Sequence, residues 1–141
     1  MVIEVNKLND VICLATGKTY EIVKETFVTA HPSCAPYPRF MPEYMIPIKK
    51  GGVVEYLYSV SEIIECLPEE IYLFKDKLNE NQFKKLVLYH ELRKNSFGYG
   101  KASEKYRFYI CERYADIYPE FRIKGIQVSK KMKLEEIPLV R

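Results

Sequence analysis

The chain contains 141 residues, of which 48% are hydrophobic and 29% are charged, and these values are ordinary for a globular protein. The length predicts one domain that covers residues 1–141. No apolar run approaches the roughly 18 residues of a membrane-spanning helix, and residues 1–10 lack the basic and apolar regions of a secretory signal. We therefore expect a cytoplasmic protein that does not enter a membrane.

The net charge of +3 conceals an uneven distribution of charge along the chain. Residues 1–70 contain six Lys and Arg against ten Asp and Glu, a balance of −4, whereas residues 71–141 contain sixteen against nine, a balance of +7. A basic second half favours an anionic partner such as nucleic acid, because neutralising phosphates releases counterions. A lysine-rich solvated surface is the alternative interpretation.

The four cysteines lie far apart and form no C-x-x-C pair. They are Cys13, Cys34, Cys66 and Cys111. His31 precedes Cys34 by three residues, but a structural zinc site needs a second pair of ligands. We expect neither a metal site nor a cofactor, and we interpret the cysteines as small buried residues.

The first third of the chain predicts a short helix and then a short strand. Apolar side chains recur at helical spacing within residues 7–16, and Gly17 would end that helix. The β-branched stretch FVTAH, residues 27–31, predicts a strand.

Residues 44–60 predict a β-hairpin. Apolar residues alternate in EYMIPIKK, and the glycine pair at 51–52 can supply the positive φ angles of a two-residue turn. The return strand is VVEYLYSV, residues 53–60. Pro47 cannot donate to a sheet, which predicts a sheet edge or a bulge at that position.

The middle of the chain predicts one long helix. Ser61 would cap a helical turn that ends before Pro68, and residues 71–74 predict a strand. The long helix begins at Asn79, which forms a capping box with Gln82, and it runs to about residue 94. His90 lies on its apolar stripe and is interpreted as buried and hydrogen-bonded rather than catalytic.

The last third predicts strands around a loop. Residues 95–105 are rich in glycine, serine and lysine and predict the loop, whereas residues 106–114 and 120–128 predict strands, the second with a kink at Gly125. The order of elements predicts an α+β fold: a small curved sheet or partly open β-barrel with two or three flanking helices.

Two segments contain candidate binding residues. The proline-rich PYPRFMPEY, residues 36–44, holds Tyr37, Arg39, Phe40 and Tyr44, and flat rings beside an arginine can form a slot for a nucleic-acid base. Packing of these rings against the core is the alternative interpretation. Tyr99 could stack on bases as well, and the candidate phosphate ligands are Arg39, Lys49, Lys50, Lys101, Lys105 and Arg107.

No motif in the sequence specifies a reaction. NSFGYG, residues 95–100, resembles the acyl-CoA loop of acetyltransferases, but that loop leaves a strand and opens a helix, whereas this segment follows a predicted helix. The absence of a nucleophile elbow, P-loop or H-E-x-x-H favours a binding module over an enzyme. A nuclease of the restriction or defence type, an acetyltransferase and a protein-interaction subunit such as a homodimer remain as alternatives.

The order of segments resembles that of PUA-like domains of the EVE and ASCH type. The resemblance rests on FVTAH, PSCAPYPRFMP, EYMIPIKK and VVEYLYSVSEIIE, followed by KYRFYICERYADIYPEFRIKG, over residues 27–64 and 105–137. It implies a barrel of five or six strands whose concave face receives RNA, or a modified or flipped base in DNA. The resemblance also implies that Tyr37, Arg39, Phe40 and Tyr44 lie near the mouth of an aromatic pocket with a basic rim.

Overall fold

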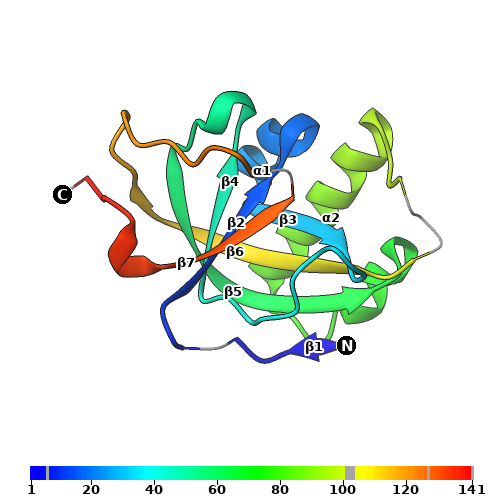
Figure 1. Ribbon diagram of the computed structural model, residues 1–141. Coiled ribbons are helices and arrows are strands. Elements are labelled where there is room, and N and C mark those ends of the chain that lie inside the picture. Colours follow the sequence, from blue (N-terminus) through cyan, green and yellow to red (C-terminus); the bar gives the residue numbers. More distant parts are fainter. Residues whose placement is uncertain (6, 101–103, 127, 141) are drawn as a thin grey trace.

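The computed structural model describes residues 1–5, 7–100, 104–126 and 128–140, and it consists of a curved sheet with helices on its outer side (Figure 1). The strands are β1 (Val2–Ile3), β2 (Asp10–Ala15), β3 (Val28–Pro32), β4 (Tyr44–Ile48), β5 (Tyr56–Cys66), β6 (Tyr106–Asp116) and β7 (Ser129–Lys133). The α-helices are α1 (Tyr20–Thr26) and α2 (Glu80–Ser96), and the 3-10 helices are η1 (Gly17–Thr19), η2 (Lys50–Gly52), η3 (Pro68–Phe74) and η4 (Leu134–Glu136). No helix in the described part of the chain is long and apolar enough to cross a bilayer.

The sheet curves like a barrel but does not close. Its strand order is β3-β6-β5-β4-β2-β7, with β1 added to β5, and among the strands of the described residues only the β2–β4 pair is parallel. Among the described residues, the outermost strands β3 and β7 do not pair with each other. The predicted α+β fold with a partly open barrel and flanking helices is therefore confirmed.

Two apolar clusters cover the sheet. The larger cluster joins the sheet to the helices, for example through Leu86 and Tyr89 of α2 and Phe108 of β6. The smaller one lies where the chain after β6 packs against β2 and β4, for example through Ile117 against Ile46. Strands that lie between the two clusters are buried on both faces, so almost every residue in them has to be apolar.

The predicted helix over residues 7–16 is wrong, because this segment contains β2. Four consecutive residues, from Val11 to Leu14, are buried between β4 on one side and β7 on the other. A continuous apolar run of this length fits a helix or an interior strand equally well by spacing. The helix of this region is α1, which begins at Tyr20, after Gly17.

The hairpin of residues 44–60 is confirmed, but its turn is wider than the predicted two residues. Pairing between β4 and β5 covers only Tyr44 and Met45 of β4. The 3-10 turn η2 connects the strands and is closed by the Lys49 N–H, which donates to the Val53 carbonyl at 2.8 Å. Its two glycines have φ angles of 81° and 79°, as the sequence predicted.

Pro47 lies in the interior strand β4, whose register with β2 is unbroken, so the predicted sheet edge or bulge at this position is wrong. β4 pairs with β2 along its whole length, but its ladder with β5 ends two residues before Pro47. The β5-facing side of β4 has no strand partner at this point. A residue without an N–H is therefore tolerated there.

Two short predictions in the middle of the chain are wrong. The segment after Ser61 continues β5 rather than forming a helical turn. Ser61 is the extra residue of a β-bulge, and its hydroxyl donates to the Ile110 carbonyl at 2.9 Å. Residues 71–74 belong to the 3-10 helix η3, whose first residue is Pro68. A proline at the start of a helix is favourable because the N–H it lacks would have no partner.

The predicted strand over residues 120–128 is also wrong. The described residues of this segment contribute one bridge, from Arg122 to Val53, and the regular strand β7 begins at Ser129. Gly125 has a φ of 75°, which breaks the extended conformation between the two. The predictions of β3, α2 and β6 are confirmed, and these elements carry the longest periodic patterns or clear caps.

Replacing Asn79 by alanine should lower the free energy of unfolding by about 1 kcal/mol. The Asn79 side chain accepts a hydrogen bond from the Gln82 N–H at 2.8 Å, and the Gln82 side chain accepts one from the Asn79 N–H at 3.0 Å. Urea denaturation measures the loss. Asn81→Ala is the matched control, because Asn81 is exposed and lies two residues after Asn79, and this change should lower the free energy of unfolding by less. Equal losses for the two variants would contradict a capping role.

Candidate functional site

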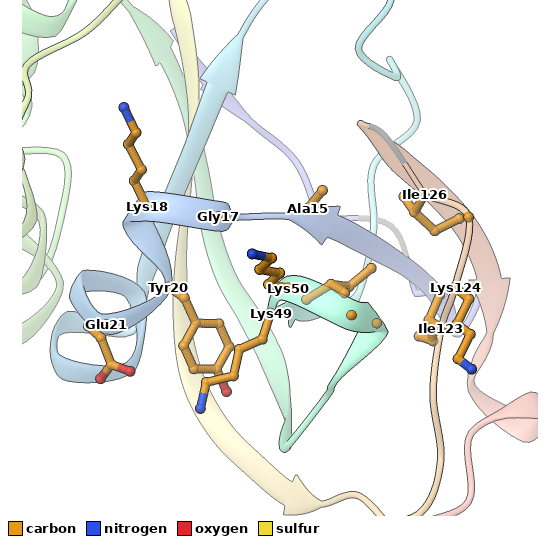
Figure 2. Close-up of a pocket in the computed structure, with 14 residues that line it drawn as sticks. Ala15, Gly17, Lys18, Tyr20, Glu21, Lys49, Lys50, Ile123, Lys124 and Ile126 are labelled. Atoms are coloured by element: carbon orange, nitrogen blue, oxygen red, sulfur yellow. The ribbon is translucent and has the colours of Figure 1, made fainter.

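Two cavities meet at the C-terminal end of β2, where Ala15 lines both. We call the larger one, of about 1190 Å³, the lysine groove (Figure 2). Its lining residues are Ala15, Gly17, Lys18, Tyr20, Glu21, Ile48, Lys49, Lys50, Gly51, Gly52, Ile123, Lys124, Gly125 and Ile126. We call the smaller one, of about 200 Å³, the seam pocket, and it is lined by Leu14, Ala15, Thr16, Thr19, Thr29, Ala30, His31, Pro32, Tyr37, Arg93 and Val128.

The lysine groove is basic. Its lining contains four lysines against one glutamate, Glu21, a balance of +3. Figure 2 shows the Lys50 side chain in the middle of the groove, with Lys18 and Lys124 at opposite sides. In the described part of the chain, no carboxylate lies within 4 Å of these three ammonium groups. Their charge is therefore available to a ligand.

The fourth lysine has a structural role. The Lys49 ammonium lies 4.8 Å from the centre of the Tyr20 ring and 3.2 Å from a carboxylate oxygen of Glu55. The Tyr20 hydroxyl donates to the same carboxylate. The hydrogen bond from Tyr20 lowers the pKa of Glu55, and the hydrogen bond from Lys49 lowers it further by a smaller amount. Burial and the hydrogen bond to Glu55 raise the pKa of Tyr20. These groups fix η2 to the start of α1 and shape one wall of the groove.

Gly52 holds the opposite wall in place. The Ile123 N–H donates to the Gly52 carbonyl at 2.9 Å, and a Cβ on Gly52 would lie 2.7 Å from the Ile123 carbonyl oxygen. Only glycine allows this close approach at a φ of 79°. Figure 2 shows Ile123, Lys124 and Ile126 along this wall, facing the segment that contains Ala15. The apolar floor of the groove thus depends on a contact between residues far apart in the sequence.

The seam pocket lies where the sheet fails to close, between the end of β2 and the outer strand β3. His31 of β3 is 3% exposed at its floor. Its Nδ1 is 2.7 Å from the Pro32 carbonyl, which can only accept, so Nδ1 carries the proton and Nε2 accepts from the Tyr109 hydroxyl at 2.8 Å. Burial lowers the pKa of His31 to about 4, with a smaller contribution from the Arg107 charge. His31 is therefore neutral near pH 7.

The rim of the seam pocket combines rings, hydroxyls and one cation. Tyr37 stacks on His31 with ring centres 4.8 Å apart and planes 4° apart. Three threonines add hydroxyl groups to the lining, namely Thr16, Thr19 and Thr29. Arg93 of α2 supplies the positive charge, and its side chain is held by hydrogen bonds to the Gly98 carbonyl at 3.1 Å and the Tyr89 hydroxyl at 2.8 Å. The Thr16 and Thr19 hydroxyls donate to the Ile48 and Thr16 carbonyls at 3.1 and 2.9 Å, so their oxygens are left as acceptors toward a ligand. Together with the remaining Arg93 N–H donors, such a fixed polar set can recognise a planar group.

The structure brings three of the predicted site residues to these cavities. Tyr37 lines the seam pocket, and Lys49 and Lys50 line the groove. Arg39 is exposed on the loop after Tyr37. Lys101 lies outside the described residues.

The other predicted residues lie elsewhere or are engaged in packing. Phe40 is half-buried against the core. Arg107 is buried, and its guanidinium donates to the Phe40 carbonyl at 3.4 Å. Tyr44 is buried in the smaller apolar cluster. Tyr99 packs under α2, with its hydroxyl 3.0 Å from His90 Nδ1. Lys105 lines a third cavity near Met1, at the opposite end of β5 from the groove. Tyr37, Phe40 and Tyr44 therefore do not form one aromatic slot.

Sequence reasoning missed most of the lining of the two cavities, including Lys18, Lys124, His31 and Arg93. A glycine followed by lysine directly after an apolar strand was an available signal for Lys18. No local pattern could place Lys124 or Arg93, because each reaches the site through tertiary packing. The glycine segment 95–100 leads from α2 toward β6, so it does not begin a helix as an acyl-CoA loop would.

Comparison with known proteins found similar structures but no similar sequences. No protein-family model and no curated protein matches the chain. The chain is similar in structure to the ASCH protein of Zymomonas mobilis. The crystal structure of that protein has 14% sequence identity and a TM-score of 0.49, covering 93% of this chain and 92% of that one.

Two variants of the same Zymomonas mobilis protein also match. A tyrosine-to-phenylalanine variant has 14% identity and a TM-score of 0.49, covering 92% of this chain and 94% of that one. A serine-to-alanine variant has 13% identity and a TM-score of 0.48, covering 94% of each chain.

Gly52→Ala should destabilise the fold more than Gly51→Ala. Both positions have a positive φ, which costs about 1 to 2 kcal/mol for alanine, but only at Gly52 would the new Cβ meet backbone, the Ile123 carbonyl oxygen. Thermal and urea denaturation of the two variants measure the difference. Equal destabilisation would contradict the proposed contact between η2 and the groove wall.

Stability should fall as the pH decreases from about 6.5 to about 4, and His31 should contribute on the order of 3 kcal/mol to this loss. In this window the unfolded chain binds a proton that folded His31 does not, so acid favours unfolding. Burial also lowers the pKa of His90, which adds to the loss with the same sign. NMR titration of the ring protons separates the two histidines. A pKa near 6.5 for His31 would contradict its buried neutral state.

Proposed function

We propose that this protein binds nucleic acid, with RNA as the first candidate, through the lysine groove and the seam pocket. The observation that carries the proposal is the meeting of two unlike cavities at one strand end. The groove has three lysines without carboxylate partners in the described chain, and the adjoining pocket is small and polar. A nucleic acid presents the matching pair of features, a charged backbone and planar polar bases.

The groove suits the phosphates. Lysine binds phosphate as a point charge, and three unpaired ammonium groups around one groove attract several phosphates. The apolar lining residues Ile48, Ile123 and Ile126 suit the less polar sugar edges between the phosphates. Binding of this kind weakens as the salt concentration increases, because releasing counterions into a more concentrated salt solution is less favourable.

The seam pocket suits a base. Its volume of about 200 Å³ is many times the roughly 10 to 15 Å³ that holds a single water molecule, so the pocket can accept a group as large as one planar ring system. Threonine hydroxyls and Arg93 can hydrogen-bond to the edge of a base, and the ring of Tyr37 can stack on its face. A group added to that edge would contact the same lining, so a modified base would be distinguished in this pocket.

Lys50→Ala combined with Lys124→Ala should weaken binding of single-stranded RNA about tenfold and should lower the slope of log K against log salt by about 1.4. Each lysine contributes one phosphate contact, worth about 0.7 of slope on a single strand. Fluorescence anisotropy at low and moderate salt measures both quantities. Modified and unmodified duplex DNA are titrated in parallel to compare the ligand classes.

Lys75→Ala with Lys84→Ala is the matched control, since these exposed lysines lie outside both cavities. The control should retain the affinity and slope of the unmodified protein. The proposal fails if the unmodified protein binds none of these nucleic acids at low salt. It also fails if the groove and control variants lose affinity equally.

A further inference from the structure

The seam pocket has a second border, on the side formed by Tyr37 and Val128. Tyr37 belongs to the loop of residues 33–43, which connects β3 to β4, and Val128 directly precedes β7 (Figure 1). The groove adjoins the pocket at Ala15, whose N–H donates to the Val128 carbonyl at 3.0 Å, so the end of β2 and the start of β7 lie side by side at the pocket. A ligand that fills the pocket from the groove therefore reaches the loop and β7 next.

Basic and aromatic side chains follow Tyr37 and Val128 along the chain, just beyond the lining of the pocket. Arg39 is exposed two residues after Tyr37, and the ring of the next residue, Phe40, lies 5.0 Å from the Lys131 ammonium of β7. We call Arg39, Phe40 and Lys131 the loop-side patch. A half-buried ring beneath a cation, next to an exposed arginine, combines the stacking surface and the charges that single strands use.

The charge of the loop-side patch is only partly neutralised within the protein. Asp10 is nearly buried and lies 2.6 Å from Lys133 but 3.7 Å from Lys131. Lys133 is thus its main partner, and the Lys131 side chain remains half-exposed. Among the described residues, no carboxylate lies within 4 Å of the Arg39 guanidinium. Arg39 and Lys131 can therefore each meet a phosphate.

We infer that the ligand is an unpaired strand several nucleotides long that crosses the open seam of the barrel, with its phosphates on the lysine groove and on the loop-side patch and one base in the seam pocket between them. This inference rests on the proposed function. A base must leave its stack and its pairing partner to enter a pocket between two strand ends, and an unpaired strand does so at little cost. Because the residues of the loop-side patch line neither cavity, a ligand that meets both basic surfaces must extend beyond the pocket, as a strand of several nucleotides does.

The test compares short and long oligouridylates, of about two and about eight nucleotides, with an RNA duplex of similar charge, by fluorescence anisotropy. The variants are Arg39→Ala with Lys131→Ala, the groove pair Lys50→Ala with Lys124→Ala, and a charge-preserving pair, Arg39→Lys with Lys131→Arg. The loop-side alanine pair should weaken the long oligomer about tenfold and lower its salt slope by about 1.4, with no change for the short one. The charge-preserving pair should restore the affinity, and the duplex should bind more weakly than the long oligomer.

The outcomes separate this inference from the proposed function. If the groove pair weakens binding but the loop-side pair leaves the long oligomer unaffected, the inference is overturned and the proposed function stands. Duplex binding as tight as that of the long oligomer also overturns it. If neither pair changes binding, the proposed function itself fails. Circular dichroism spectra and melting temperatures of each variant exclude loss of folding as the cause.

Discussion

The open seam between β3 and β7 is the constraint on which the rest of the structure depends. The two outer strands do not pair in the described chain, so side chains of the loop 33–43 join them instead. Tyr37 stacks on His31 of β3, and Phe40 lies beneath Lys131 of β7. Arg107 anchors the loop from inside by donating to the Phe40 carbonyl. Joining by side chains rather than a continuous ladder leaves a gap, and that gap is the seam pocket.

The end of β2 adds the charged surface to this gap. Directly after the strand, η1 turns the chain so that Thr16 and Thr19 line the pocket while Lys18 lines the groove. The groove then needs a second wall, which the chain after β6 supplies through the Gly52–Ile123 contact. A positively charged groove and a small polar pocket are thereby placed next to each other. Neither cavity alone would distinguish a nucleic acid from other anions or other planar molecules.

Sequence reasoning succeeded where the pattern of one element is sufficient and failed where neighbours decide. Helix α2 has a capping box at Asn79 and a long apolar stripe, so its prediction needed no tertiary information. The run from Val11 to Leu14 was assigned to a helix because its spacing is ambiguous, and only pairing with β4 and β7 makes it a strand. Lys49 and Lys50 were found through the turn that contains them, whereas Arg93 depends on how α2 packs.

The sequence by itself determined the α+β class, the hairpin with its two positive-φ glycines, the long capped helix and the basic second half of the chain. These properties are local or compositional, so neighbouring residues are enough to specify them. Only the tertiary structure decided which aromatic and basic residues share a cavity. Tyr44 lies in the core and Tyr99 packs under α2, whereas His31 lines the seam pocket and Lys124 lines the lysine groove. The physical reason is that side chains are sorted between core and cavity by packing against residues far away in the sequence.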